Sequence, residues 1–265
     1  MTSARKRTGG IALVLGATLA LMGCAGADPQ AKQAAAARKQ AEAAAASSGV
    51  TRKLARAARD AGDLASAINL YKSAVARRPN DTALLVELGD TQLGIGAIDD
   101  AIKSFDKVGA KSPARIGALL GLERAQLMLH EPAKALVYAD SATARAPKDK
   151  RVQVGRGVAL DMLGRHGAAQ ACYRKAIAAD PHDVAARSDL ALSLALAGRY
   201  GEAIRIMTPI ARAPSATPRL RQNLALIYGL KGDVAAAREL SRTDLTAAET
   251  DANLRFFALV RNAEK

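Results

Sequence analysis

The sequence predicts an all-α solenoid, a row of stacked helix pairs, because small residues recur along it at one fixed spacing. Alanine returns every 34 residues, at Ala67, Ala101, Ala135, Ala169, Ala203 and Ala237. Glycine keeps the same period, at Gly62, Gly96, Gly164, Gly198 and Gly232. Proline shares it, at Pro79, Pro113, Pro147 and Pro181. A constant period of this length is typical of a repeat array.

One unit illustrates how the repeat works. In residues 51–79, an opening helix is followed by a turn at Gly62, and Ala67, Tyr71 and Ala74 share one face of a second helix. The small residues let two helix backbones approach, and the aromatic ring fills the gap between them. Each helix pair leaves an apolar face that it cannot bury alone, so we expect neighbouring units to stack.

This unit resembles the tetratricopeptide repeat, which has a small residue, an aromatic residue four positions later and a closing proline. The resemblance implies a right-handed superhelical solenoid with a concave binding face. Residues 50–245 hold six repeats, and residues 246–265 form a C-terminal capping helix with polar and apolar sides. The six units are expected at 48–81, 82–115, 116–149, 150–183, 184–217 and 218–245.

The first 23 residues are predicted to form an export signal. A basic segment, residues 5–7, precedes an apolar stretch, 11–21, that is too short to span a bilayer. The sequence that follows, Leu21-Met22-Gly23-Cys24, resembles a bacterial lipobox, which implies cleavage before Cys24 and lipidation of that residue. An ordinary secretory signal or an uncleaved anchor is the alternative.

Residues 24–49 are rich in alanine and are expected to act as a tether between the lipid and the repeats. Residue 25 is alanine rather than aspartate, which by resemblance to lipoprotein sorting rules favours the outer membrane. The expected location is therefore the periplasmic face of the outer membrane, with the chain held by its lipid anchor.

The third unit departs from the pattern at a charged residue. Glu123 stands where a small residue is expected, and in the next unit Arg156 occupies a position normally held by leucine. A buried unpaired charge is destabilising, so one interpretation is that Glu123 and Arg156 form an ion pair. In the other, the unit is locally rotated and both side chains reach water.

Composition and spacing argue against several classes of function. The histidines, His130, His166 and His182, fall at separate turns and have no metal-ligand spacing, so we expect no catalytic residues, metal site or cofactor. Cys172 is expected to be a small hydrophobic residue of a second helix. The net charge of +14 favours acidic partners or anionic lipid headgroups, but aromatics are only 3% of the residues, which argues against nucleic acid.

The predicted binding site is a groove formed by the first helix of each repeat. By resemblance to tetratricopeptide proteins, its lining residues are Val86, Leu93, Leu120, Leu127, Met128, Val154, Val158, Met162, Leu192, Leu196, Leu226 and Leu230. These side chains are aliphatic or Met, and an apolar trough with a basic rim suits an amphipathic or extended segment of a protein partner better than a charged tail or a small-molecule substrate. Some of these positions are alternatively core between repeats.

The C-terminal part resembles a narrower family. The run Arg221-Gln222-Asn223-Leu224-Ala225-Leu226, with Gly232-Asp233, Asp244-Leu245 and Ala252-Asn253-Leu254, is similar to the TadD family of tight-adherence (Flp) pilus assembly proteins. That resemblance implies a pilotin-like lipoprotein whose partner is the pilus secretin or another envelope-assembly component. An adaptor for a periplasmic protease or peptidoglycan hydrolase, and a type IV pilus pilotin, are the alternatives.

Overall fold

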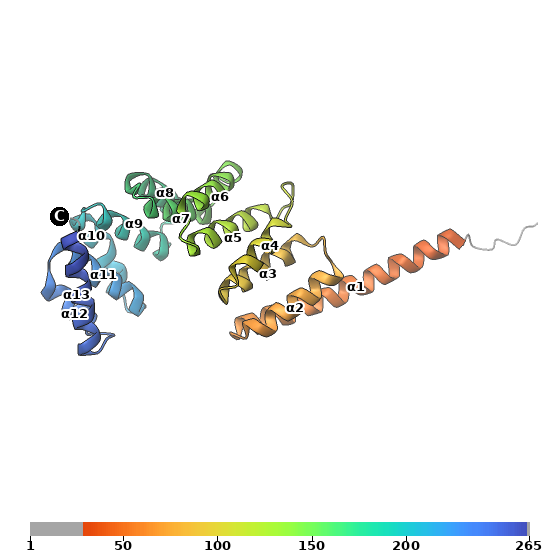
Figure 1. The fold of residues 1–265 in the computed structure, drawn as a ribbon, viewed down its shortest axis with the longest axis horizontal. Coiled ribbons are helices and arrows are strands. Elements are labelled where there is room, and N and C mark those ends of the chain that lie inside the picture. The colour runs from red at the N-terminus through yellow and green to blue at the C-terminus, as the bar shows by residue number, and fades with distance from the viewer. Residues whose placement is uncertain (1–28, 264–265) are drawn as a thin grey trace, which may run out of the picture. The chain divides into compact units, whose positions relative to one another are not determined.

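The computed structural model describes residues 29–263, and every regular element in that range is an α-helix (Figure 1). Two compact units divide the chain, Met1–Ala43 and Ala44–Lys265. The helices are α1 (Pro29–Asp60), α2 (Leu64–Arg77), α3 (Thr82–Gly94), α4 (Ile98–Asp106), α5 (Arg115–Met128), α6 (Pro132–Arg145), α7 (Lys150–Met162), α8 (His166–Ala179), α9 (Val184–Leu196), α10 (Tyr200–Ala211), α11 (Pro218–Lys231), α12 (Val234–Ser241) and α13 (Ala247–Ala263).

The first unit is described only in its residues 29–43, which belong to α1. In the second unit, each odd-numbered helix from α3 to α11 packs against the even-numbered helix that follows it and against the one that precedes it. The last helix, α13, packs on α11 and α12. The predicted solenoid of helix pairs with a C-terminal capping helix is therefore confirmed in the described residues.

The first repeat begins inside α1. This helix runs without a break through the expected end of the tether at residue 49. Ser48 is buried and its hydroxyl donates to the carbonyl oxygen of Ala74 on α2 at 3.3 Å. Further along α1, Ala55 packs in the same core as Ala67 and Tyr71. The part of α1 after residue 43 thus serves as the first helix of the array.

Aspartates at two recurring positions of the repeat start several helices. The side chains of Asp63, Asp81, Asp183 and Asp233 each accept a hydrogen bond from a backbone N–H three residues later, and Asp149 does so two residues later. These bonds satisfy donors that the first helical turn leaves free, and the negative charge interacts favourably with the helix dipole. The sequence therefore sets where α2, α3, α7, α9 and α12 begin.

The turn inside most repeats needs a left-handed backbone. The five periodic glycines have φ between 70° and 94°, where a side chain is disfavoured. In the third repeat His130 holds that position with φ of 56°, the one non-glycine residue with positive φ in the described range. Histidine thus takes the turn position predicted for it, in a strained conformation.

Aromatic rings packed on glycines fill the core. The Phe105 ring lies between Gly89 and Gly121, and a Cβ added at Gly89 would stand 2.5 Å from Phe105 Cε1. The same relation holds between Tyr173 and Gly157, again at 2.5 Å. The packing that the repeat pattern predicted, a ring filling the space beside a small residue, is thereby confirmed. Any larger residue at these glycines would displace the ring.

Candidate functional site

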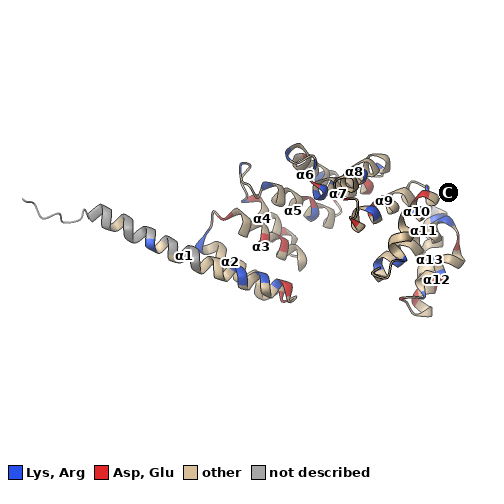
Figure 2. Ribbon diagram, turned by 180° about the vertical axis from the view of Figure 1, so that it is seen from behind, with Lys and Arg blue, Asp and Glu red and all other residues tan. Residues whose placement is uncertain are grey.

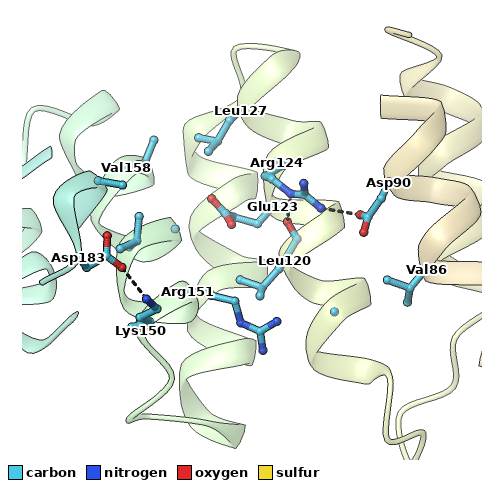
Figure 3. A pocket seen from close by; sticks show the side chains of 14 residues that line it. Val86, Asp90, Leu120, Glu123, Arg124, Leu127, Lys150, Arg151, Val158 and Asp183 are labelled. Atoms are coloured by element: carbon cyan, nitrogen blue, oxygen red, sulfur yellow. Dashed lines mark hydrogen bonds and ion pairs between the residues drawn. The ribbon is translucent and has the colours of Figure 1, made fainter. Parts of the chain in front are cut away.

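A groove of about 650 Å³ runs across three consecutive first helices, α3, α5 and α7, and ends at the start of α9. Its apolar lining is aliphatic and comes from each of the three helices (Figure 3). The aliphatic residues are Val86, Leu120, Leu127, Val154 and Val158. Their spacing places them on one side of each helix, since Leu120 and Leu127 are two turns apart and Val154 and Val158 one turn apart.

The twelve predicted groove residues fall into three environments. The five aliphatic residues just named line the groove. Leu93 and Leu230 are buried in the core between helices. The remaining five do not line this groove: Met128, Met162 and Leu196 are exposed, and Leu192 and Leu226 are half-buried. The helical period alone did not separate these environments, because each depends on how the next repeat stacks.

The rim of the groove carries charges of both signs, which form pairs. Arg124 on α5 contacts Asp90 on α3, with Nη2 2.6 Å from Oδ1. Lys150 on α7 lies 2.8 Å from the carboxylate of Asp183, and both contacts are drawn in Figure 3. Arg151 likewise bonds to the carboxylate of Asp149, two residues earlier in the chain, at 2.6 Å. The rim is therefore largely neutralised, whereas the sequence suggested a basic one.

These pairs also shift the pKa values of the groups involved. Hydrogen bonds to Asp180 and Asp183 raise the pKa of Lys150. Burial raises the pKa of Asp90, and the Arg124 guanidinium acts in the opposite direction.

Over the rest of the array, lysine and arginine are spread over many helices rather than massed on one, as Figure 2 shows.

Glu123 is the unusual residue of this site. It is only 2% exposed, lines the groove, and has a side-chain oxygen, Oε1, that accepts no hydrogen bond. Burial raises the pKa of Glu123 to about 7, and the neighbouring Arg124 opposes that shift. Carboxylic acids behave in this way when they are removed from water without a compensating partner.

The predicted ion pair between Glu123 and Arg156 is wrong. Arg156 instead binds Asp140 on α6, with Nε 2.7 Å from Oδ1, and donates to the Cys172 sulfur at 3.3 Å. The alternative, in which both side chains reach water, fails for Glu123 because it is buried. The Glu123 carboxylate packs against Gly155 on α7.

The third repeat lacks the aromatic residue of the neighbouring repeats, and this absence explains how the Glu123 side chain is accommodated. Glu123 occupies the repeat position that is Gly89 in the preceding unit, and Gly155 occupies that of Gly121. In the preceding unit the Phe105 ring lies between those two glycines. The third unit has Ala139 in place of that ring, so the Glu123 side chain extends across the space toward Gly155.

A second polar cluster joins α7, α8 and α9, and sequence reasoning did not find it. Asp161 Oδ1 accepts from Ser193 Oγ at 2.7 Å and lies 2.8 Å from His166 Nδ1, while Oδ2 accepts from Tyr173 at 3.0 Å. Burial and the Asp161 charge raise the pKa of Tyr173, so that its hydroxyl stays protonated. Ser193 is fully buried and lies on α9, in the next repeat. These hydrogen bonds therefore link two adjacent repeats.

Other candidate chemistry is sparse in residues 29–263. This range contains no group of three or more His, Cys, Asp or Glu side chains placed to hold a metal ion. Cys172 is buried on α8, as expected for a small hydrophobic residue, and Cys24 lies outside the described residues. None of the described helices is both long and apolar enough to cross a membrane.

Comparison with known proteins agrees with this architecture. Residues 58–113 and 163–216 match family models of the tetratricopeptide repeat. No protein of curated function matches the sequence.

Many solved structures share the fold. A tetratricopeptide repeat protein of Thermus thermophilus is 22% identical, with a TM-score of 0.60 over 68% of this chain and 98% of that one. A tetratricopeptide repeat protein of Parabacteroides merdae is 23% identical, with a TM-score of 0.64 over 82% and 87%. MamA of Desulfovibrio magneticus is 21% identical, with a TM-score of 0.52 over 61% and 92%. The chain therefore carries tetratricopeptide repeats, which suggest a scaffold for protein–protein interaction.

Proposed function

We propose that this protein is a scaffold that binds an apolar segment of a protein partner in the groove formed by α3, α5 and α7. The observation that carries the proposal is the aliphatic wall shared by three consecutive first helices. A groove of about 650 Å³ admits several side chains of one helix or extended segment. Burial of such side chains is the usual source of affinity at protein interfaces.

The charges of the rim support an apolar segment over an acidic tail. Binding a chain-terminal carboxylate requires basic groups free to donate to it. In this groove Arg124, Lys150 and Arg151 each already contact a carboxylate of the same chain. An acidic ligand would compete with those carboxylates for the same cations, whereas an apolar segment leaves the pairs intact.

The proposed biological setting follows from the sequence resemblances. In this proposal Cys24 is lipidated and anchors the protein to the periplasmic face of the outer membrane. The partner is a secretin or another component of a Flp/Tad pilus or related secretion system, and the protein acts on it as a pilotin-like assembly factor. The lipobox-like segment and the C-terminal similarity to the TadD family support this setting.

Groove variants test the binding mode. Leu127→Lys with Val158→Lys should reduce capture of the secretin from detergent-solubilised envelopes, by roughly a hundredfold in affinity, because two buried apolar contacts become charged. Val137→Lys is the matched control, since Val137 on α6 is 64% exposed and does not line the groove. Undiminished capture by the double variant would place binding elsewhere. Capture of a peptidoglycan hydrolase or protease in place of the secretin would favour the adaptor function.

Substitution of the two cysteines tests the anchor. Cys24→Ser should release the protein from membranes into the soluble periplasmic fraction and remove the acyl mass from its N-terminal peptide. Cys172→Ala is the control, because it removes the other cysteine of the sequence and should leave fractionation unchanged. If the Cys24→Ser protein stays in the membrane fraction and wild type carries no acyl mass, the lipoprotein assignment is wrong.

A further inference from the structure

The groove contains an ionisable group with an unmet hydrogen-bonding need. Glu123 lines the groove, yet its Oε1 is buried and accepts no hydrogen bond. Such an atom destabilises the free protein. Phenylalanine or tyrosine fills the corresponding space in neighbouring repeats without this penalty. Packing alone therefore does not account for a carboxylate at position 123, whereas a role in binding a ligand would.

The charged side chains around Glu123 are already committed to one another. From α3, Asp90 faces the groove and pairs with Arg124 of α5. From α7, Lys150 pairs with Asp183 at the start of α9, and Arg151 pairs with the carboxylate of Asp149. Among the described residues no basic side chain forms a hydrogen bond or ion pair with Glu123, although the Arg124 charge opposes the rise of its pKa, so a segment bound in the groove can supply the donor.

We propose that Glu123 selects the ligand of this groove, and that the bound segment carries a lysine or arginine among aliphatic side chains, with its N–H groups donating to the Glu123 carboxylate. This inference rests on the proposed function, because it names the chemistry of the segment that the groove binds. The aliphatic side chains of the segment contact Leu120, Leu127, Val154 and Val158 around that ion pair. An acidic side chain at the same point would meet Glu123 with like charge.

The surroundings of the carboxylate suit such a ligand. Glu123 and Gly155 both line the groove, and the Glu123 carboxylate rests on the Gly155 backbone in its wall, where a basic side chain of a bound segment can approach it. A cation brought next to a buried carboxylate favours its ionised form. Because the pKa of Glu123 is about 7 in the free protein, binding of the cation is coupled to loss of a proton.

Peptide selection tests the inference without requiring that the natural partner be identified. Random 12-residue peptides on phage are selected against the immobilised full-length chain in detergent, and in parallel against Glu123→Gln and against the Leu127→Lys/Val158→Lys variant. Wild type should enrich peptides with one lysine or arginine among aliphatic residues. Glu123→Gln should enrich aliphatic peptides without that basic residue. Circular dichroism checks that each variant is folded.

Synthetic versions of the best wild-type peptide give the decisive measurement. Replacing its basic residue by norleucine should weaken binding to wild type roughly tenfold or more, and binding to Glu123→Gln less than about threefold. Affinity of the basic peptide for wild type should rise roughly tenfold from pH 6 to pH 8, as Glu123 becomes ionised. The affinity of the basic peptide for Glu123→Gln should change little over the same pH range.

The outcomes separate the two proposals. Groove-dependent peptides without basic enrichment, or equal affinity of the lysine and norleucine peptides, would overturn the role of Glu123 and leave the groove as a binding site. Selected peptides that bind the Leu127→Lys/Val158→Lys variant as well as wild type would overturn the groove itself. Failure to select any peptide would count against both.

Discussion

Glu123 and Gly155 are matched across two repeats: the carboxylate of one fills the space that the missing side chain of the other leaves. A Cβ at Gly155 would lie 2.9 Å from Glu123 Cδ and closer still to Oε2. Gly121 stands in the same relation to Phe105 one repeat earlier. The array therefore keeps one packing rule, a large side chain against a bare backbone, while exchanging an aromatic ring for a carboxylate.

The first prediction follows from that contact. Gly155→Ala should lower the free energy of unfolding by about 1–3 kcal/mol, because the new methyl group overlaps the Glu123 carboxylate. In a Glu123→Ala background the same substitution should be neutral or stabilising, since alanine favours helix. Chemical denaturation measures both. Gly201→Ala on α10 is the control, because a Cβ there meets nothing within 4 Å. Equal losses in the two backgrounds would show that the contact is not responsible.

The second prediction concerns pH. Because burial raises the pKa of Glu123 from 4.5 in the unfolded chain to about 7, the native state binds more protons than the unfolded state between those values. Native stability is therefore lost as pH rises through this window. Glutamine at position 123 does not titrate in this range. The free energy of unfolding of Glu123→Gln, relative to that of wild type, should therefore increase by about 3 kcal/mol between pH 4.5 and pH 8.

Denaturation of wild type and Glu123→Gln at a series of pH values gives this difference directly. Other titrating groups contribute equally to both proteins, so the difference isolates Glu123. A constant difference from pH 4.5 to pH 8 would mean that Glu123 ionises in the native state as it does in the unfolded chain.

The third prediction concerns the turn of the third repeat. His130 holds a left-handed conformation, with φ of 56°, that five glycines adopt in other repeats. His130→Gly should raise the free energy of unfolding by about 1 kcal/mol, because glycine adopts this backbone without strain. The reverse change, Gly164→His at φ of 70°, should lower it by a similar amount. Thermal unfolding distinguishes these signs, and destabilisation by His130→Gly would indicate an interaction of the imidazole that outweighs the strain.

The periodic features of this chain could be predicted from sequence because each depends on residues within one repeat. Gly96 fixes a turn, Asp81 caps a helix, and Phe105 fills the space beside Gly89, all within 34 residues. Residues that break the period could not be placed in that way, because they have partners in a neighbouring repeat.

Arg156 illustrates the difficulty. The sequence offered Glu123 as a compensating charge, but the helix–helix stacking brought Asp140 within 2.7 Å instead. The Asp161 cluster is similar: its partner Ser193 is 32 residues away, and serine at that position carries no signal of its own. For the groove, the repeat pattern pointed to the first helices α3 to α11, whereas the groove is lined from α3, α5, α7 and the start of α9, because the stacking of adjacent repeats decides which aliphatic residues are covered.

The last prediction separates those aliphatic residues. Leu93 is buried in the core, whereas Leu127 lines the groove, although both were expected to bind the partner. Leu93→Ala should destabilise the fold by about 2–5 kcal/mol, because it leaves a cavity among packed helices. Leu127→Ala removes a half-buried side chain that relaxes more easily, so its effect on unfolding should be smaller, about 1 kcal/mol. For binding of a selected groove peptide the order should reverse, with Leu127→Ala weakening it and folded Leu93→Ala leaving it near wild type. If Leu93→Ala weakened peptide binding more than Leu127→Ala under conditions where both are folded, the assignment of groove and core would be reversed, and the binding surface would lie on a different face of α3 and α5.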